Sequence, residues 1–225
     1  MKTKSPSTAS KRKRILLVED HPLMREAVAL WIRRAPDLDI CGEAESANTA
    51  ISLVSSRKPD LVLTDISLRG RSGLEMVKDL AVQHPGLPVL VLSMHEESLY
   101  AGRALRAGAR GYIMKRAGGA RLIEAIREVL QGGIAVSPET LSHLLEGFAG
   151  KKTRSSRTTL SHLTDREFEI LQLIGEAKSN REIAAELHIS AKTVETHCLN
   201  LMDKLKFKKR AALLRFALQY GSNGS

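Results

Sequence analysis

Between residues 15 and 130, short apolar runs alternate with longer amphipathic stretches, and this alternation restricts the fold more than any other feature of the sequence. We expect strands at residues 15–18, 39–43, 61–64, 89–92 and 111–114. Helices are expected at residues 22–34, 48–56, 73–84, 98–107 and 117–130, with Asn48 as an N-cap and Gly108 as a C-terminal stop. Continuous apolar strands are typical of a parallel sheet covered on both faces. The pattern therefore predicts a five-stranded, doubly wound α/β domain.

Polar side chains follow four of the expected strands, at the point where each strand ends. They are Glu19 and Asp20, Asp65, Ser93 and Lys115. Because the carboxyl ends of parallel strands meet at one edge of a sheet, these side chains should converge there. Three carboxylates at close range repel one another unless a cation offsets their charge, and Mg²⁺ suits such oxygen ligands. Mg²⁺ and Lys115 would together neutralise a phosphoryl group carried by one of the carboxylates.

The segments that contain these residues resemble the receiver domain of bacterial two-component systems. The resemblance covers the whole α/β region and lies in Val18-Glu-Asp-His21, Asp60-Leu-Val-Leu-Thr-Asp-Ile-Ser67, Val91-Leu-Ser93 and Gly108-Ala-Arg-Gly-Tyr-Ile-Met-Lys115. It implies the flavodoxin-like strand order 2-1-3-4-5 and phosphorylation of Asp65 by a sensor histidine kinase. It also implies roles for individual residues: Mg²⁺ is held by Glu19, Asp20, Asp65 and the carbonyl of Ser67, while the phosphoryl group meets Ser93 and Lys115, and Tyr112 changes rotamer.

One turn departs from the receiver pattern. Receiver domains usually have Pro four residues after the phosphoacceptor, whereas this chain has Arg69, followed by Gly70 and Ser72-Gly73. We therefore expect a looser turn at this point. The phosphorylation residues themselves are all present, so a working receiver is expected.

Residues 134–157 are expected to form a linker that contains a short helix. Pro138 after Ser137 favours a helix start, and Leu141, Leu144, Leu145 and Phe148 share one face. Residues 150–159 are polar and basic, so they should be flexible and allow the two flanking domains to dock and undock.

Four short helices are expected in the C-terminal region, residues 158–221. Capping boxes at Thr164-Asp-Arg-Glu167 and Ser179-Asn-Arg-Glu182 mark the first two helix starts. Ser190 can cap a third helix with Val194, His197, Leu201 and Leu205 on one face, and residues 210–219 form the fourth. With a tight turn at His188-Ile189, the pattern predicts a helix-turn-helix.

This region resembles the LuxR-type DNA-binding domain, through Leu163-Thr-Asp-Arg-Glu167, Ser179-Asn-Arg-Glu-Ile-Ala184, Ile189-Ser-Ala-Lys-Thr-Val-Glu-Thr-His197 and Lys204-Leu205. With a receiver in front, the architecture is similar to the NarL/FixJ family of transcriptional regulators. The resemblance implies that the third helix enters the major groove and offers Lys192, Thr193, Glu195, Thr196, Leu199, Asn200 and Lys204 to DNA. The family often has a basic residue where this chain has Cys198 or Leu199. The affinity for phosphates should therefore depend more on Lys206, Lys208, Lys209 and Arg210. The alternative is that these four residues form only a solvated basic face.

The distribution of charge favours a nucleic-acid partner for the C-terminal region. The formal net charge is +10, with +6 on residues 1–14, −2 on residues 15–150 and +6 on residues 151–225. Residues 1–13 are expected to be a disordered basic tail, and residues 14–133 the receiver. Cys41 and Cys198 fit ordinary thiols in a reducing compartment. No stretch approaches the ~20 apolar residues of a membrane span, and the tail lacks the apolar core of a signal peptide, so we expect a cytoplasmic protein without a membrane partner.

The sequence thus predicts a two-component transcription regulator that binds double-stranded DNA, as a homodimer when phosphorylated, with RNA polymerase as a further candidate partner. It would hydrolyse its own phosphoryl group slowly and would not be a metabolic enzyme. An aspartyl-phosphate phosphatase is one alternative, but such enzymes usually have a second Asp where this chain has Ser67. The other alternative is a LuxR-type regulator that responds to a ligand or partner without phosphorylation; the complete set of phosphorylation residues argues against it.

Overall fold

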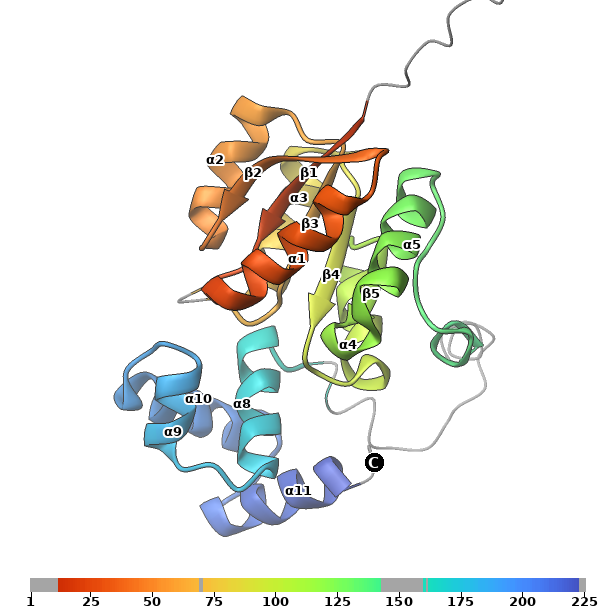
Figure 1. Ribbon diagram of the computed structural model, residues 1–225. Helices are drawn as coiled ribbons and strands as arrows, with labels where there is room; N and C mark the ends of the chain where they lie inside the picture. Colours follow the sequence, from red (N-terminus) through yellow and green to blue (C-terminus); the bar gives the residue numbers. More distant parts are fainter. Residues whose placement is uncertain (1–11, 69–70, 143–159, 161, 223–225) are drawn as a thin grey trace, which may run out of the picture.

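The computed structural model describes residues 12–68, 71–142, 160 and 162–222, with side chains as far as residue 218. The N-terminal domain contains a five-stranded parallel sheet in the order β2-β1-β3-β4-β5, as predicted (Figure 1). Its strands are β1 (Lys13–Val18), β2 (Leu38–Ala44), β3 (Leu61–Thr64), β4 (Val89–Ser93) and β5 (Gly111–Met114). Its helices are α1 (Pro22–Arg34), α2 (Ala47–Arg57), α3 (Gly73–Gln83), α4 (Glu97–Ala107) and α5 (Gly118–Leu130), with a short 3₁₀ helix at Lys115–Ala117.

Helices cover both faces of the sheet, α1 and α5 on one face and α2, α3 and α4 on the other (Figure 1). Because side chains alternate along a strand, Ile15 and Leu17 of β1 pack into the first layer, and Leu16 and Val18 pack into the second. Every residue of β3 and β4 is buried. Burial on both faces explains why these strands are continuously apolar in sequence.

The helix ends agree with the sequence prediction at Gly108 and disagree at Asn48. Gly108 ends α4 with φ at 111°, and its N–H donates to the carbonyls of Ala104 and Leu105. The predicted cap at Asn48 is wrong, because α2 begins earlier and Asn48 lies inside its first turn. Ser46 is the cap: its backbone is extended, and its hydroxyl accepts from the N–H of Thr49 at 3.3 Å. Serine and asparagine cap helices about equally well, so local propensity could not choose between them.

The described part of the C-terminal domain contains the four predicted helices, α8 (Asp165–Gly175), α9 (Asn180–Glu186), α10 (Ala191–Lys204) and α11 (Arg210–Ser222). Both predicted capping boxes, at Thr164 with Glu167 and at Ser179 with Glu182, are confirmed. Ser190 caps α10 by accepting from the N–H of Thr193 at 3.0 Å. Among the helices in the described part of the chain, none is long and apolar enough to span a membrane.

The segment that joins the two domains is described only in part. A helix begins at Pro138, as the sequence suggested, and its described turn continues to residue 142. The predicted apolar face at Leu144, Leu145 and Phe148, the basic stretch from residue 150 and the N-terminal tail lie outside the described residues. So do Arg69 and Gly70, where the sequence departs from the receiver pattern.

Candidate functional site

Three carboxylates meet at the carboxyl edge of the sheet. Glu19 and Asp20 follow β1, and Asp65 follows the neighbouring strand β3. One oxygen from each residue can be chosen so that all three lie within 4.8 Å of one another, and the three residues are 1 %, 7 % and 7 % exposed. Such a set of close oxygen ligands fits a hard divalent cation such as Mg²⁺. The prediction that strand ends would bring these acids together therefore matches the geometry.

Lys115 lies against two of these carboxylates. Its Nζ is 2.6 Å from Glu19 Oε2 and 2.7 Å from Asp65 Oδ2. Burial alone would lower the pKa of Lys115, but the charges of Asp65 and Glu19 outweigh burial and raise it, so the ammonium keeps its proton. For Glu19, burial and then the charge of Asp65 raise the pKa by more than Lys115 lowers it. Three carboxylates thus share the ammonium of Lys115 in this pocket.

Ser93 and Tyr112 form the wall of the pocket on the β4–β5 side, and both are 0 % exposed. The Ser93 hydroxyl accepts from the N–H of His95 at 3.2 Å, and the Tyr112 hydroxyl donates to the carbonyl of His95 at 2.9 Å. The imidazole of His95 in turn lies with Nε2 3.0 Å from Ser67 Oγ. His95 therefore contacts three residues that the sequence assigned to the site.

The start of α3 must approach the predicted acceptor closely. Gly73 is the first residue of α3, and a Cβ atom there would collide with the carbonyl oxygen of Asp65 and with Cα of Ile66. The N–H of Gly73 donates to the carbonyl of Ile66 at 2.7 Å. Only glycine fits this close approach of backbone to backbone, so Gly73 shapes the loop that presents Asp65.

The helix α10 presents an exposed face. All seven residues proposed as DNA contacts are exposed, whereas Val194, Cys198 and Leu201 pack into the domain core. Three of the seven side chains already have partners within the chain: Lys204 Nζ is 2.7 Å from Glu167 Oε2, Thr193 Oγ1 is 2.8 Å from Ser190 Oγ, and Thr196 Oγ1 donates to the carbonyl of Lys192 at 3.0 Å. Of the two positions where the family often has a basic residue, Cys198 is therefore in the core, and Leu199, at 61 % exposed, lies on the outer face.

The turn between α9 and α10 is held by a residue of α8. Arg166 Nη2 donates to the carbonyl of Leu187 at 2.9 Å, and Nη1 donates to Glu169 Oε2 at 2.9 Å. His188, within the turn, has φ at 51°, a left-handed conformation. The basic residues that follow α10, Lys206, Lys208, Lys209 and Arg210, are all exposed.

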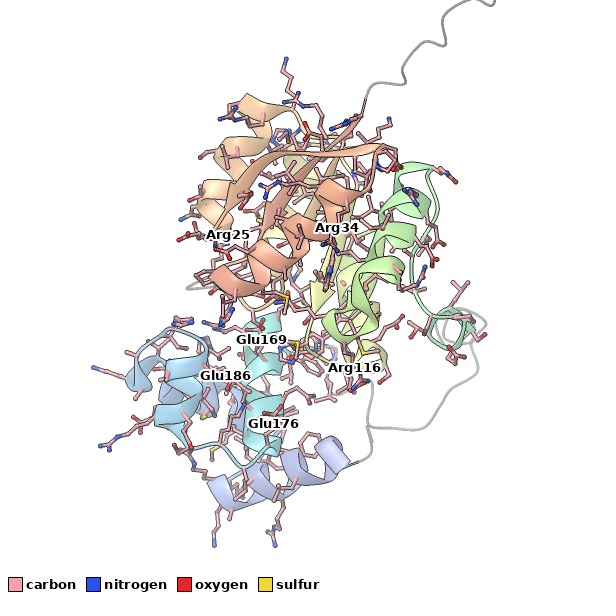
Figure 2. The ribbon with its side chains drawn as sticks, viewed as in Figure 1. Arg25, Arg34, Arg116, Glu169, Glu176 and Glu186 are labelled. Carbon is pink, nitrogen blue, oxygen red and sulfur yellow. The ribbon has the colours of Figure 1, made fainter. Side chains whose placement is uncertain are left out.

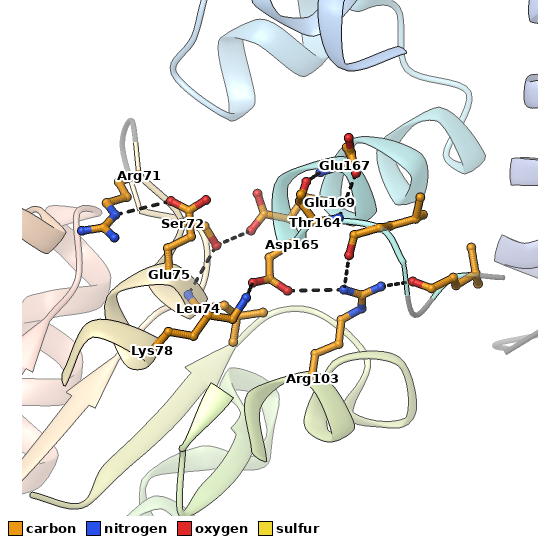
Figure 3. Close-up of polar contacts among 12 residues, drawn as sticks. Arg71, Ser72, Leu74, Glu75, Lys78, Arg103, Thr164, Asp165, Glu167 and Glu169 are labelled. Carbon is orange, nitrogen blue, oxygen red and sulfur yellow. Dashed lines mark hydrogen bonds and ion pairs between the residues drawn. The ribbon is translucent and has the colours of Figure 1, made fainter. Parts of the chain in front are cut away.

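The N-terminal part of α8 binds to α3 and α4 of the other domain. Asp165 lies between two cations, 2.6 Å from Lys78 Nζ and 3.3 Å from Arg103 Nη1. Arg103 also donates to the carbonyls of Leu160 and Leu163 (Figure 3). The two domains are thus joined by a network of charge-assisted hydrogen bonds.

A second polar link crosses the interface at Glu169, which Figure 2 shows where α8 meets the sheet-containing domain. Its Oε1 accepts from Ser72 Oγ at 2.9 Å, across the contact drawn in Figure 3, while Oε2 accepts from Arg166. Ser72 is also the N-cap of α3, in the loop that follows Asp65. On the other side of the pocket, His188 Nε2 lies 4.0 Å from Asp20 Oδ2. The C-terminal domain therefore lies beside the acidic pocket.

Sequence reasoning missed the residues that join the domains, because nothing in their local patterns identifies a partner. They are Ser72, Lys78, Arg103, Asp165, Glu169 and His188. Of these positions, only Ser72, in Ser72-Gly73, stood out in the sequence, because the turn there departs from the usual receiver pattern. In the sequence, that departure indicated only a looser turn.

Comparison with known proteins gives two domain matches. The family "Response regulator receiver domain" matches residues 15–127, and "Bacterial regulatory proteins, luxR family" matches residues 161–217. The chain is 33 % identical over 220 residues to the transcriptional regulatory protein DegU of Brevibacillus brevis, covering 92 % of this chain and 93 % of that protein. It is 32 % identical over 210 residues to the oxygen regulatory protein NreC of Staphylococcus carnosus, covering 92 % and 97 %.

Among solved structures, a two-component response regulator of the LuxR family from Aurantimonas sp. SI85-9A1 is similar to this chain. It is 34 % identical with a TM-score of 0.57, and the match covers 62 % of this chain and 99 % of that one. The similarities to DegU and NreC extend over both domains and over nearly the full length of those two regulators.

Proposed function

Because the chain belongs to the NarL/FixJ family of response regulators, with a receiver domain and a LuxR-type DNA-binding domain, we propose that phosphorylation of Asp65 by a sensor histidine kinase controls its binding to promoter DNA. The observation that supports this most directly is the buried pocket in which Glu19, Asp20 and Asp65 converge and Lys115 contacts two of the three. Relatives of this chain are transcriptional regulators, so it is not a metabolic enzyme.

The chemistry requires a nucleophile and positive charge. An oxygen of Asp65 forms the bond to phosphorus, the bond between phosphorus and the kinase histidine breaks, and the histidine nitrogen keeps the bonding electrons. Mg²⁺ bound by Glu19, Asp20, Asp65 and the Ser67 carbonyl would supply charge that offsets the incoming phosphoryl group. Lys115 pairs with a phosphoryl oxygen, Ser93 donates a hydrogen bond to another, and the accompanying movement of Tyr112 transmits the change.

Slow loss of the phosphoryl group follows from the same site. Hydrolysis needs a water aligned opposite the Asp65 oxygen, and a general base speeds that attack. Ser67, two residues after the acceptor, lacks the carboxylate that phosphatases usually have at this place. We therefore propose a phospho-aspartate that persists long enough to act as a signal.

Labelling by a small phosphodonor in the presence of Mg²⁺ tests the acceptor. Asp65→Asn should abolish labelling, because an amide is too weak a nucleophile to replace the carboxylate. Asp60→Asn is the matched control. Asp60 precedes β3, at the end of the strand opposite Asp65, and its carboxylate accepts from the N–H of Arg14 at 2.7 Å. Persistent labelling of Asp65→Asn would reject the acceptor assignment, whereas absence of labelling in the unchanged protein would favour a receiver that signals without phosphorylation.

For the output, we propose that α10 enters the major groove. Lys192, Thr193 and Lys204 suit phosphates, Glu195 suits cytosine N4, and Asn200 suits adenine. Thr196 and Leu199 suit a thymine methyl group. The exposure of all seven side chains supports this assignment. Lys204 would have to exchange Glu167 for a phosphate, so its contribution should be smaller than that of Lys192.

We further propose that phosphorylation releases the DNA-binding domain and promotes homodimers on paired half-sites, from which the protein acts on RNA polymerase. Two contacts support a coupling between pocket and interface: the turn residue His188 lies beside Asp20, and Ser72, in the loop after Asp65, donates to Glu169. Light scattering and operator titration of the phosphorylated and unphosphorylated protein test it. Equal mass distributions and equal affinities would contradict the mechanism.

A further inference from the structure

Phe168 of α8 is the apolar centre of the interface between the domains. Its ring meets the ring of Tyr100 of α4 edge-on, with centroids 5.0 Å apart and planes at 71°. The guanidinium carbon of Arg103 lies 4.1 Å from the centroid of the same ring. Phe168 and Tyr100 are 2 % and 1 % exposed, and they belong to one continuous hydrophobic cluster that includes residues of both domains. The aromatic contact is therefore a dry, well-packed attachment point.

The ring of Tyr100 also extends toward the phosphorylation pocket. Its other aromatic neighbour is His95, stacked with centroids 4.6 Å apart and planes at 19°. His95 in turn contacts Ser67, Ser93 and Tyr112 of the pocket. A continuous chain of contacts thus leads from the pocket through His95 and Tyr100 to α8, so a shift of His95 would alter the surface on which Phe168 packs.

The hydroxyl of Tyr100 is unusual, because it is buried and has no hydrogen-bond partner among the described residues. Burial, followed by the negative charge of Glu169, raises the pKa of Tyr100 well above its ordinary value, so the hydroxyl stays neutral. A buried hydroxyl without a partner lowers the stability of the state that buries it, by about tenfold in the equilibrium constant. Because Phe168 of α8 packs on the Tyr100 ring, movement of α8 away from this ring would admit water to the hydroxyl and remove the penalty.

We infer that Tyr100 sets the strength of docking between the two domains: its ring provides the surface for Phe168, and its unpaired hydroxyl weakens the docked state enough for it to be released. The inference rests on the proposed function, in which docking opposes DNA binding. Docking itself, however, can be measured without phosphorylation and without DNA.

The test is the docked fraction of the full-length, unphosphorylated chain, measured by energy transfer between dyes on Val82→Cys in α3 and Leu214→Cys in α11. These positions are 81 % and 42 % exposed. Cys41→Ser removes the partly exposed native thiol and keeps a donor for the carbonyl of Ile15, while Cys198 is 3 % exposed and remains. Urea titration of the transfer signal then gives the docking equilibrium of each variant.

Two substitutions at one position should act in opposite directions. Tyr100→Phe keeps the ring and removes the hydroxyl, so the docking constant should rise about tenfold. Tyr100→Leu removes the aromatic surface for Phe168, so the constant should fall by a similar factor. Arg106→Gln, an exposed change on the same helix, is the control and should leave the constant unchanged.

An unchanged or weakened docking constant in Tyr100→Phe would overturn the inference, and so would a Tyr100→Leu protein that docks as well as the control. Circular dichroism of each variant verifies that both domains remain folded. Failure of Asp65 labelling would reject the proposed function instead, and it would leave these docking measurements intact. The two failures are therefore distinguishable.

Discussion

Replacing Lys115 by Ala should destabilise the receiver domain, because Lys115 is the cation that balances the acidic pocket. Its Nζ contacts Glu19 at 2.6 Å and Asp65 at 2.7 Å, and its side chain is 5 % exposed. The substitution leaves three buried carboxylates whose ligand oxygens lie within 4.8 Å of one another. The change therefore removes a favourable interaction and also exposes a repulsive one.

The size of the effect can be estimated in two ways. Removing one partner of a buried ion pair typically costs about 3–5 kcal/mol. Two like charges 4.8 Å apart at an effective dielectric constant of about 20 repel by roughly 3.5 kcal/mol. Protonation of Glu19, whose pKa burial already raises, relieves part of this repulsion. We expect a loss of about 3 kcal/mol near neutral pH, and a smaller loss as the pH is lowered toward the pKa of Glu19.

Urea unfolding followed by tryptophan fluorescence measures this loss. Trp31 is the single tryptophan of the chain and lies on α1, where a Cβ at Gly119 of α5 would be 2.6 Å from its ring. The signal therefore reports the receiver domain. Arg116→Ala is the matched control, since Arg116 is adjacent in sequence but its side chain is 63 % exposed and pairs with an exposed Glu96. Such a surface pair contributes at most ~1 kcal/mol.

Titration with Mg²⁺ completes the experiment. A ligand that binds only the folded state adds about 2.7 kcal/mol of stability at a hundred times its Kd, and the more negative pocket of Lys115→Ala should gain more from the cation than the control. The reasoning would be refuted by a Lys115→Ala protein that is as stable as Arg116→Ala in buffer with a chelator. It would also be refuted by a smaller Mg²⁺ effect in Lys115→Ala than in the control.

Three further predictions concern the loop after the acceptor, the DNA-binding domain and its ligand. Gly73→Ala should cost about 1–3 kcal/mol in urea unfolding, because the added methyl group collides with the carbonyl of Asp65; an unchanged midpoint would contradict the packing argument. Burial raises the pKa of Glu167, but the ion pair with Lys204 and the hydrogen bonds from Thr164 together outweigh burial and lower the pKa below the ordinary 4.5. The stability from this pair is therefore present above pH 4.5 and is lost as the pH falls below it. In Lys204→Met, the melting temperature should therefore fall less steeply as the pH is lowered through this range; the same pH dependence in both proteins would count against the pair. Operator affinity should fall as salt rises, and Lys192→Ala should reduce the slope of log affinity against log salt by about one; an unchanged slope would place Lys192 away from the phosphates.

The sheet and its strand ends could be predicted because their signals are local. Apolar runs of strand length marked most strands of the sheet, and parallel topology brought Asp65 to the same edge as Glu19 and Lys115. Capping boxes gave the starts of α8 and α9 in the same way. The strand bounds differ from prediction by at most two residues, because fraying ends depend on neighbouring strands. The cap of α2 was misplaced because Ser46 and Asn48 are both good caps.

The face of α10 that the core covers required the tertiary structure. Cys198 and Leu199 are neighbours in sequence, and helical periodicity alone allows either to pack inward. The positions of α8 and α9 decide the matter: Cys198 is 3 % exposed and Leu199 is 61 % exposed. The same geometry pairs Lys204 with Glu167, 37 residues away, and so engages the ammonium of Lys204 within the domain.

The sequence by itself thus determined the two folds and the edge at which the acids converge, since both follow from short-range periodicity, capping and the alternation of strands and helices. Only the tertiary structure decided how the two domains contact each other. The hydrogen bond between Ser72 and Glu169 joins residues 97 positions apart. The packing of Tyr100 against Phe168 is not indicated by any sequence pattern in the two helices that contain them. Such contacts depend on surfaces that become complementary after each domain has folded, when apolar rings and paired charges leave water together.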